Sequence, residues 1–231
     1  MKKRLELLDL LRGIAMIYVM LYHLMFDMRY IYGMDTPSIL TPGDPVFEAA
    51  HKFFLWILFA VSGICVGFSR DPLKRGVLLY LAGFGITAAT QIFMPEELIV
   101  FGVLSCFGAC MVLTSLCRPV LEKLPPYTAA VWAVLWVLTM NFPVSVPHIT
   151  ELYPLGIIGE GFSSADYFPL IPNIFMFLAG FALSPAVKKL PESFYEKHTA
   201  LSPLCFIGRH SLIFYIAHQP VMLLICELIA R

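Results

Sequence analysis

The sequence predicts an all-α, polytopic membrane helix bundle with about seven transmembrane helices and a cytoplasmic N-terminus. The 231 residues are 59% hydrophobic and only 14% charged, with a mean hydropathy of +0.79, whereas soluble domains are about half apolar and about a quarter charged. Apolar stretches long enough to cross the hydrocarbon core recur along the chain. Lysine and arginine gather at alternate ends of these stretches. Such a chain needs lipid as its solvent.

Seven stretches are apolar enough to cross hydrocarbon that is about 30 Å thick. Each should be a helix, because every unpaired backbone group in lipid costs several kcal/mol. They cover residues 7–30, 46–69, 76–93, 98–117, 127–142, 167–187 and 203–229. The fifth is the shortest. Pro169 and Pro172 predict an irregular or kinked entry to the sixth.

The distribution of basic residues supports this topology, since lysine and arginine concentrate in cytoplasmic loops. With the N-terminus inside, the cytoplasmic ends collect Lys2, Lys3, Arg4, Arg12, Arg70, Lys74, Arg75, Arg118, Lys123, Lys188, Lys189, Lys197 and Arg209, and the outer ends keep Arg29, Lys52 and Arg231. An even number of helices would destroy this asymmetry. We therefore expect a multi-pass protein of a cell membrane, such as the bacterial cytoplasmic membrane, with one membrane domain over residues 1–231.

Charge and cysteine usage exclude several classes of protein. The formal net charge is zero, so we expect no nucleic-acid partner. The six cysteines fall in or beside apolar runs, which favours small hydrophobic side chains over a disulfide framework, and we expect no metal. The first apolar stretch carries Arg12 and lacks a small-residue cleavage site, so we interpret it as a retained helix.

The first predicted helix has a polar stripe. An ionisable side chain at the centre of a membrane helix costs about 2.5 to 3.5 kcal/mol on insertion scales, so each one needs a reason. Steps of three and four residues place Asp9, Arg12, Met16, Met20, His23, Asp27 and Tyr30 on one helical face, which we expect to face the interior of the bundle. A histidine beside a carboxylate, as in His23 with Asp27, suits a general base. The spacing also fits a purely structural pair that ties helices together.

The last predicted helix repeats the anomaly. Arg209, His210 and Ser211 stand at its cytoplasmic end, where a basic pair either holds an anionic phosphate or only extends to lipid headgroups. Tyr215 and His218 share a face deeper in the helix, and Gln219 follows. His218 fits either a site residue or a core histidine with satisfied hydrogen bonds.

Three further candidates lie elsewhere. His51 opens the second helix, where interfacial anchoring is the alternative explanation. Asp166 and Asn173 stand where the long outer loop 143–166 meets the sixth helix. A loop of this length in a small protein is either the wall or lid of a site or a passive surface cap.

Five blocks of sequence in five of the seven stretches resemble a known family. They are LDLLRGIAMIYVMLYHLMFDM at 8–28, FLWILFAVSGICVGFSR at 54–70, FGVLSCFG at 101–108, DYFPLIPN at 166–173 and GRHSLIFYIAHQPV at 208–221. In this order they resemble the bacterial DUF1624 group, which is related to the heparan-alpha-glucosaminide N-acetyltransferase catalytic domain and similar to a wider set of transmembrane acyltransferases. The chain lacks the Trp-Asn-Gly stretch of the heparan enzyme, and Ser105 stands where relatives often have histidine.

The resemblance implies an acyltransferase that takes an acyl group from cytoplasmic acyl-CoA to an acceptor on the far side. Another branch of these enzymes uses an arginine and a histidine eleven residues apart, as Arg12 and His23 are here. The resemblance therefore implies that His23 is the base or the transient acyl carrier and that Asp27 orients it. Arg12, Arg209, His210 and Ser211 are then the residues expected on the CoA side.

The expected function is therefore a membrane acyltransferase with acetyl-CoA or another acyl-CoA as co-substrate. Its acceptor would be a glycan, a lipid headgroup or a cell-wall component. The protein itself would be in contact with membrane lipid, and the sequence does not exclude a homo-oligomer. Two alternatives remain. A small proton-coupled transporter or permease would use the histidine and aspartate residues as a proton relay, although the inverted repeats of many transporters are not detected. A non-catalytic membrane assembly subunit would tolerate the loss of His23.

Overall fold

The computed structural model describes residues 5–147, 151–191, 194 and 201–230. Lys2, Lys3, Arg4, Lys197 and Arg231 of the charge pattern lie outside the described residues. The chain divides into two compact units. We call Met1–Val61 with Leu190–Arg231 the terminal unit, and Ser62–Lys189 the central unit.

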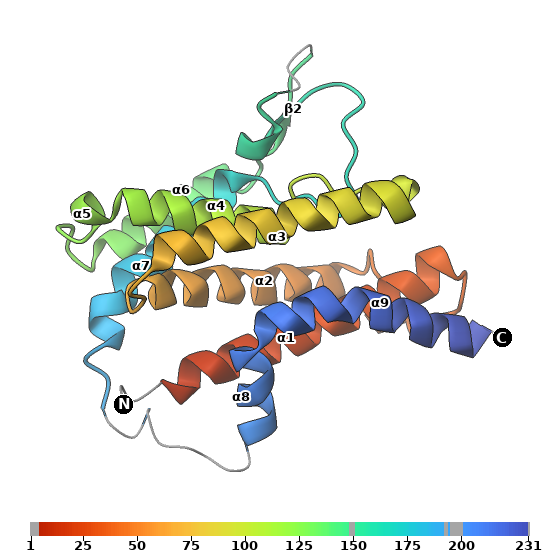
Figure 1. Cartoon of the computed structure of the whole chain (residues 1–231), viewed down its shortest axis with the longest axis horizontal. Helices are drawn as coiled ribbons and strands as arrows, with labels where there is room; N and C mark the ends of the chain where they lie inside the picture. Colours follow the sequence, from red (N-terminus) through yellow and green to blue (C-terminus); the bar gives the residue numbers. More distant parts are fainter. Residues whose placement is uncertain (1–4, 148–150, 192–193, 195–200, 231) are drawn as a thin grey trace. The chain divides into compact units, whose positions relative to one another are not determined.

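The terminal unit is built from helices at both ends of the chain. Helix α1 (Glu6–Phe26) continues into a π-helical turn, η1 (Asp27–Ile31), and a 3-10 turn, η2 (Ser38–Leu40), precedes α2 (Pro45–Val66), which begins in this unit and ends in the other. The C-terminal segment forms α8 (Ser202–Arg209) and α9 (Ser211–Ala230). Helix α1 packs against both α8 and α9, as Figure 1 shows in red and blue.

Two glycines allow α1 and α8 to touch through their backbones. A Cβ atom added at Gly13 would overlap the carbonyl group of Leu204, and one added at Gly208 would overlap the carbonyl group of Asp9. Small residues at such crossings are typical of membrane helices, because close backbone contact replaces the hydrophobic driving force that lipid removes. The contact brings the C-terminal end of α8 against the first turns of α1.

The central unit pairs helices in sequence order. It contains α3 (Pro72–Phe93), η3 (Pro95–Glu97), α4 (Val103–Leu116), α5 (Arg118–Leu121), α6 (Thr128–Thr139), η4 (Tyr153–Leu155) and α7 (Leu170–Val187). Helix α3 packs along α4, α6 packs along α7, and α4 also contacts α7. In the long loop that connects α6 to α7, strands β1 (Val144–Ser145) and β2 (Ile157–Ile158) form a two-residue parallel ladder.

Every predicted apolar stretch contains a helix, which confirms the all-α multi-pass class. Within the described residues, five helical segments are long and apolar enough to cross a membrane: Glu6–Ile31, Ser38–Val66, Pro72–Phe93, Leu170–Val187 and Ser211–Ala230. Helices α4 and α6 have 14 and 12 residues, so they reach only about 21 and 18 Å at 1.5 Å per residue. The number of spans and the side of the N-terminus therefore stay predictions.

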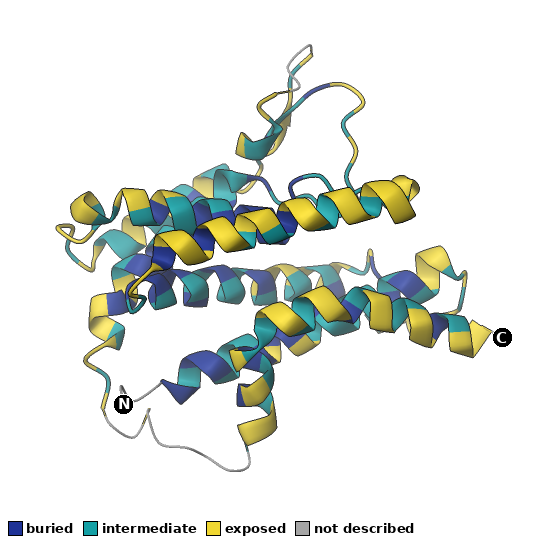
Figure 2. Cartoon of the chain, in the orientation of Figure 1, coloured by how far each residue is buried: buried dark blue, intermediate teal, exposed yellow. Residues whose placement is uncertain are grey.

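Apolar side chains cover the outside of the long helices. Figure 2 shows α3 as mostly exposed along the face in view, and Leu81, Phe84 and Phe93 are among its exposed apolar residues. A soluble protein rarely leaves so many large apolar side chains in water along one helix. This surface suits contact with lipid chains.

Two helix boundaries depend on local backbone geometry. The last stretch was expected to be one helix, but it breaks at His210 (φ −111°, ψ 23°), and α8 turns sharply away from α9 in Figure 1. The contact of Gly208 with α1 holds α8 in its own direction, which the apolar pattern does not reveal. The irregular entry to α7 is confirmed, since Ile171 is non-helical (φ −95°, ψ 125°). Pro172 disfavours helical geometry at the residue before it.

The polar stripe of α1 faces inward for most of its length. Asp9, Met16 and Asp27 are buried, but Tyr30 is 58% exposed, so its predicted place in the interior is wrong. The chain changes from α-helix to π-helix at Asp27. A π-turn has more residues per turn than an α-helix, so the three-and-four spacing no longer holds beyond this point.

Candidate active site

Three histidines from three helices meet in the terminal unit. The ring centroids of His23 on α1 and His218 on α9 are 4.8 Å apart with the rings nearly perpendicular, and those of His23 and His51 on α2 are 6.2 Å apart. We call these three residues the imidazole cluster. No group of three or more His, Cys, Asp or Glu side chains that could hold a metal ion occurs among the described residues.

Backbone carbonyl groups determine where two of these rings carry their hydrogen. Nδ1 of His23 lies 2.9 Å from the carbonyl oxygen of Val19, and Nδ1 of His218 contacts the carbonyl oxygen of Tyr215. A carbonyl oxygen only accepts, so each Nδ1 donates, and Nε2 of the neutral ring keeps its lone pair. His218 is only 7% exposed, and its Nε2 has no hydrogen-bond partner within the described part of the chain. Both Nε2 atoms can therefore accept a proton.

Asp27 and Gln219 form a second pair beside the cluster. Nε2 of Gln219 lies 2.9 and 3.0 Å from the two carboxylate oxygens of buried Asp27. A carboxylate only accepts, so the amide must turn its nitrogen toward Asp27. Oε1 of Gln219 points elsewhere and is buried without a partner among the residues that the structure describes. The role of Asp27 as orienter of His23 stays a prediction, and Gln219 is a partner that helix periodicity did not predict.

Tyr22 and Glu48 flank His51 and were missed by the sequence reasoning. The Tyr22 ring centroid lies 3.6 Å from that of His51. The Tyr22 hydroxyl donates to Oε1 of Glu48 over 2.6 Å, and the backbone N–H of Gly43 donates to the same oxygen. A usable signal existed, because a carboxylate at the start of an apolar helix three residues before a histidine lies on the same helical face.

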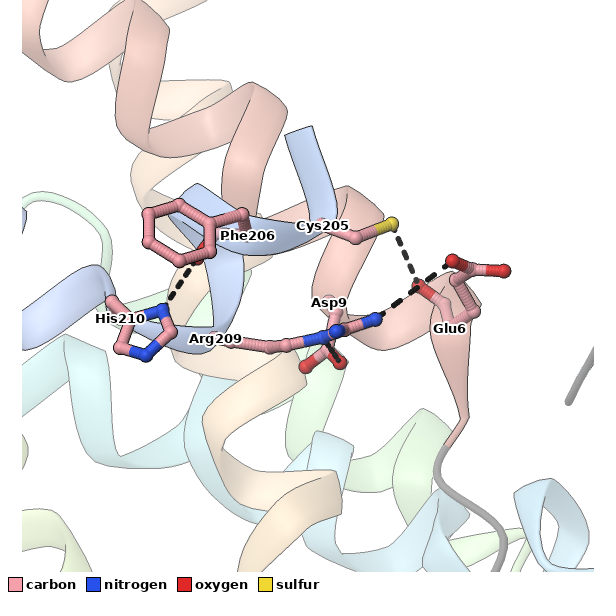
Figure 3. Close-up of polar contacts among 6 residues, drawn as sticks. All are labelled: Glu6, Asp9, Cys205, Phe206, Arg209 and His210. Carbon is pink, nitrogen blue, oxygen red and sulfur yellow. Dashed lines mark hydrogen bonds and ion pairs between the residues drawn. The ribbon is translucent and has the colours of Figure 1, made fainter. Parts of the chain in front are cut away.

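The basic end of the terminal unit is organised around Arg209 (Figure 3). Its Nε lies 3.1 Å from Oδ2 of Asp9, and its Nη2 lies 3.8 Å from Oε1 of Glu6. Both carboxylates are buried, whereas the arginine side chain is 31% exposed. Arg209 therefore ties α8 to α1 and offsets the charge of two acids. Figure 3 also shows Cys205, whose Sγ lies 3.9 Å from the carbonyl oxygen of Glu6.

The other residues expected on the CoA side have different surroundings. Nδ1 of His210 donates to the carbonyl oxygen of Phe206 over 2.9 Å, and the two rings lie 4.4 Å apart. Ser211 is the first residue of α9. Arg12 makes no hydrogen bond or ion pair with any residue in the described ranges, and the acid one turn before it, Asp9, binds Arg209.

The predicted site residues thus fall into separate groups. His23, Asp27, His51, Tyr215, His218 and Gln219 lie in the terminal unit around the imidazole cluster, the Tyr215 ring being 5.3 Å from that of His218. Asp166 and Asn173 belong to the central unit. Oδ2 of Asp166 accepts from the backbone N–H of Val103 over 3.4 Å at the start of α4, and Asn173 donates to the carbonyl oxygen of Pro169 over 2.8 Å. The Asp166 contact satisfies a backbone N–H in the first turn of α4, and the Asn173 contact joins the first turn of α7 to its N-cap residue, each inside the central unit.

Comparison with known proteins assigns the family. The model of the heparan-alpha-glucosaminide N-acetyltransferase catalytic family matches residues 4–220, a range that includes the whole imidazole cluster, Asp27 and Gln219. No curated protein and no solved structure matches the chain significantly. The resemblance seen in the five sequence blocks is confirmed over most of the chain. The chain belongs to the heparan-alpha-glucosaminide N-acetyltransferase catalytic-domain family, a family of membrane acetyltransferases.

Proposed function

We propose that this protein transfers an acetyl group from cytoplasmic acetyl-CoA to an amine or hydroxyl group of a glycan, lipid headgroup or cell-wall component outside a cell membrane. The observation that carries the proposal is the imidazole cluster, which lies inside the range that the acetyltransferase family matches. Buried ionisable side chains in membrane helices are expensive and are usually kept for function. A family of acetyltransferases favours turnover over the transporter and assembly-subunit alternatives.

His23 is the proposed base. Its Nε2 takes the proton of the acceptor as the nitrogen or oxygen attacks the thioester carbonyl carbon. A carbon–nitrogen or carbon–oxygen bond forms, the carbon–sulfur bond breaks, and the proton passes from His23 to the CoA thiolate. The Val19 carbonyl supports this role, because it holds Nδ1 and leaves Nε2 for the substrate. In the covalent variant of the same proposal, Nε2 carries the acetyl group briefly before the acceptor attacks.

The CoA phosphates would bind at the cytoplasmic end of the same unit. Arg12 is the principal candidate, because Asp9, the acid one turn before it, forms its ion pair with Arg209. It precedes His23 by eleven residues, roughly 16 Å along a helix at 1.5 Å per residue, a length that the pantetheine arm can bridge. Arg209, His210 and Ser211 would flank the phosphates, with Arg209 also bound to Asp9 and Glu6.

His23→Asn is the direct test, because asparagine keeps one donor and one acceptor at similar size but neither takes a proton nor carries an acetyl group near neutral pH. The purified variant should remain folded and should still be stabilised thermally by acetyl-CoA. Acetyl transfer to methyl α-D-glucosaminide should fall by at least about a hundredfold. The matched control is Met20→Leu, a substitution of similar volume on the same face of α1, which should keep its activity.

Two outcomes would contradict the proposal. An active His23→Asn variant would exclude His23 as base and move the search to His218 and His51. Folded wild-type protein that is not stabilised by acetyl-CoA or by any longer acyl-CoA would favour the proton-coupled transporter.

A further inference from the structure

Two polar side-chain atoms on consecutive residues of α9 are buried without hydrogen-bond partners among the described residues. They are Nε2 of His218 and Oε1 of Gln219. Leaving a buried polar atom unpaired costs about 1 to 3 kcal/mol. Proteins satisfy nearly all such atoms, so two on consecutive residues beside an imidazole cluster indicate that a ligand completes them.

The surrounding acceptors determine the chemistry of both atoms. Asp27 accepts from the amide nitrogen of Gln219, so the amide cannot turn over without placing its oxygen against a carboxylate. The Tyr215 carbonyl accepts from Nδ1 of His218, so Nε2 of the neutral ring is also an acceptor. Nε2 of His23, whose ring centroid is 4.8 Å from that of His218, has the same character. Oε1 of Gln219 and the Nε2 atoms of His218 and His23 therefore accept hydrogen bonds and donate none.

We propose that His218 and Gln219 form the subsite that holds the attacking N–H or O–H group of the acyl acceptor. Asp27 is then a positioning residue that keeps the Gln219 oxygen turned toward this group. The inference rests on the proposed acetyl transfer and deepens it by assigning the residues that recognise the nucleophile. A neutral amine has two N–H groups, so it can donate to these acceptors, attack the thioester carbonyl carbon with its lone pair and then lose one proton to Nε2 of His23. A hydroxyl has one proton, which it donates to one of these acceptors when bound and passes to Nε2 of His23 as its lone pair attacks.

The test compares three probes that differ at one carbon. Methyl α-D-glucosaminide carries an amine at C2, methyl α-D-glucoside a hydroxyl, and methyl 2-deoxy-α-D-glucoside neither. Binding to the full-length protein in lipid nanodiscs is measured by calorimetry without acyl-CoA. Wild-type protein should bind at least one of the first two about tenfold or more tightly than the 2-deoxy sugar, since a site built for a hydrogen bond rejects an analogue that lacks it. Comparison of the amine and hydroxyl probes identifies the nucleophile.

His218→Phe removes both nitrogens and keeps an aromatic ring against Tyr215 and His23. It should abolish the discrimination between the probes and raise the acceptor KM by about tenfold, the value of a single lost hydrogen bond. Thermal stabilisation by acetyl-CoA should stay at the wild-type level. Leu224→Ala, on the exposed side of the same helix, is the control and should keep both the discrimination and the KM.

Gln219→Met tests the second acceptor at similar side-chain length. It is made in an Asp27→Asn background, so that no buried carboxylate loses the amide donor that Gln219 supplies. The double variant should bind the favoured sugar more weakly than Asp27→Asn alone. Equal binding by these two variants would contradict the role of Gln219.

The remaining outcomes separate the subsite from the proposed function. A folded His218→Phe variant that still discriminates, or wild-type protein that binds all three sugars alike or none of them, would overturn the subsite. If the wild-type protein transfers acetyl groups and His218→Phe has the same acceptor KM as wild type, the subsite is also overturned, while the proposed function stands. Discrimination that His218→Phe abolishes, without acetyl transfer by wild type, would support the subsite and count against the function.

Discussion

Backbone carbonyl groups orient the imidazoles of His23 and His218, because Val19 and Tyr215 accept from their Nδ1 atoms. These partners belong to the same helices as the rings, so a side-chain substitution elsewhere leaves both orientations in place. Asp27, in contrast, binds a side chain of another helix, Gln219. The effect of changing Asp27 should therefore reach the reaction mainly through Gln219.

Asp27→Asn should raise the acceptor KM by roughly three- to tenfold, the equivalent of about 1 kcal/mol for one hydrogen bond. An amide at position 27 both donates and accepts, so Gln219 can turn either way and no longer always presents its oxygen. The kcat should fall much less than in His23→Asn. Steady-state kinetics with methyl α-D-glucosaminide separate the two parameters. A loss of kcat as large as that of His23→Asn, with KM unchanged, would show that Asp27 acts directly on His23.

At the scale of elements, α1 and α8 are held together by contacts of two kinds. Gly13 and Gly208 let the backbones touch. Arg209 then reaches back from the end of α8 to Asp9 and Glu6 in the first turns of α1. Removal of either kind of contact should loosen α8 and not the imidazole cluster, whose residues come from α1, α2 and α9.

Gly208→Ala should lower the stability of the protein by about 1 to 3 kcal/mol, because the new Cβ atom overlaps the backbone of Asp9 and a well-packed contact must open. Gly85→Ala is the control, since a Cβ atom there, on α3, meets nothing within 4 Å. Alanine is the better helix former, so this variant should be as stable as wild type or more stable by up to about 1 kcal/mol. Thermal unfolding in detergent compares the two. A Gly208→Ala protein as stable as Gly85→Ala would contradict the close contact.

Arg12 and Arg209 should respond differently to substitution. Arg209→Ala removes the cation that offsets two buried carboxylates, so the melting temperature should fall, by less than the loss for a fully buried pair because the arginine is partly exposed. Arg209→Lys keeps the charge, so its melting temperature should fall less than that of Arg209→Ala.

Arg12→Ala should leave the melting temperature nearly unchanged and should weaken acetyl-CoA binding by about tenfold, as expected for a lost charge-assisted hydrogen bond. Thermal shifts with and without acetyl-CoA measure both effects. The reverse pattern would assign the phosphates to Arg209.

At the scale of the whole molecule, two topologies differ in whether α4 and α6 cross the membrane. Five segments are long enough within the described residues, whereas α4 and α6 are short. Five and seven spans both place residues 94–97 outside and the start of α8 inside, because α4 and α6 are either both spans or both not. The two topologies differ in the side of the membrane on which the segment between α4 and α6 lies. This segment holds Arg118 and Lys123.

The native Cys117, exposed at the end of α4, distinguishes the two topologies. The positive-inside rule places it beside Arg118 in the cytoplasm, so we expect no labelling by a membrane-impermeant thiol reagent in intact cells and full labelling in opened membranes. Cysteines introduced at Ser38 and Glu160 should react in intact cells, and one at Asp71 should not. Labelling of Cys117 from outside would reduce the spans to five, and labelling at Asp71 would reverse the orientation.

The sequence alone was sufficient for the class of protein, the family and the approximate positions of the helices, apart from the break between α8 and α9 at His210. Composition and stretches of about 20 apolar residues can be recognised along the sequence itself, because a membrane helix makes its backbone hydrogen bonds within its own segment. The domain extent of 1–231 and the roles of individual site residues stay predictions. The place of Tyr30 was wrong, since nothing in the spacing announces the π-turn at Asp27.

Only the tertiary structure decided which polar residues meet. Periodicity relates residues on one helix, so it could place His23 and Asp27 on one face of α1, but it says nothing about the neighbour of that face. The contacts of His23 with His218 and of Asp27 with Gln219 join residues almost two hundred positions apart. They depend on the packing of α9 on α1, and packing between helices is set by the shapes of both surfaces together, which no single stretch of sequence contains.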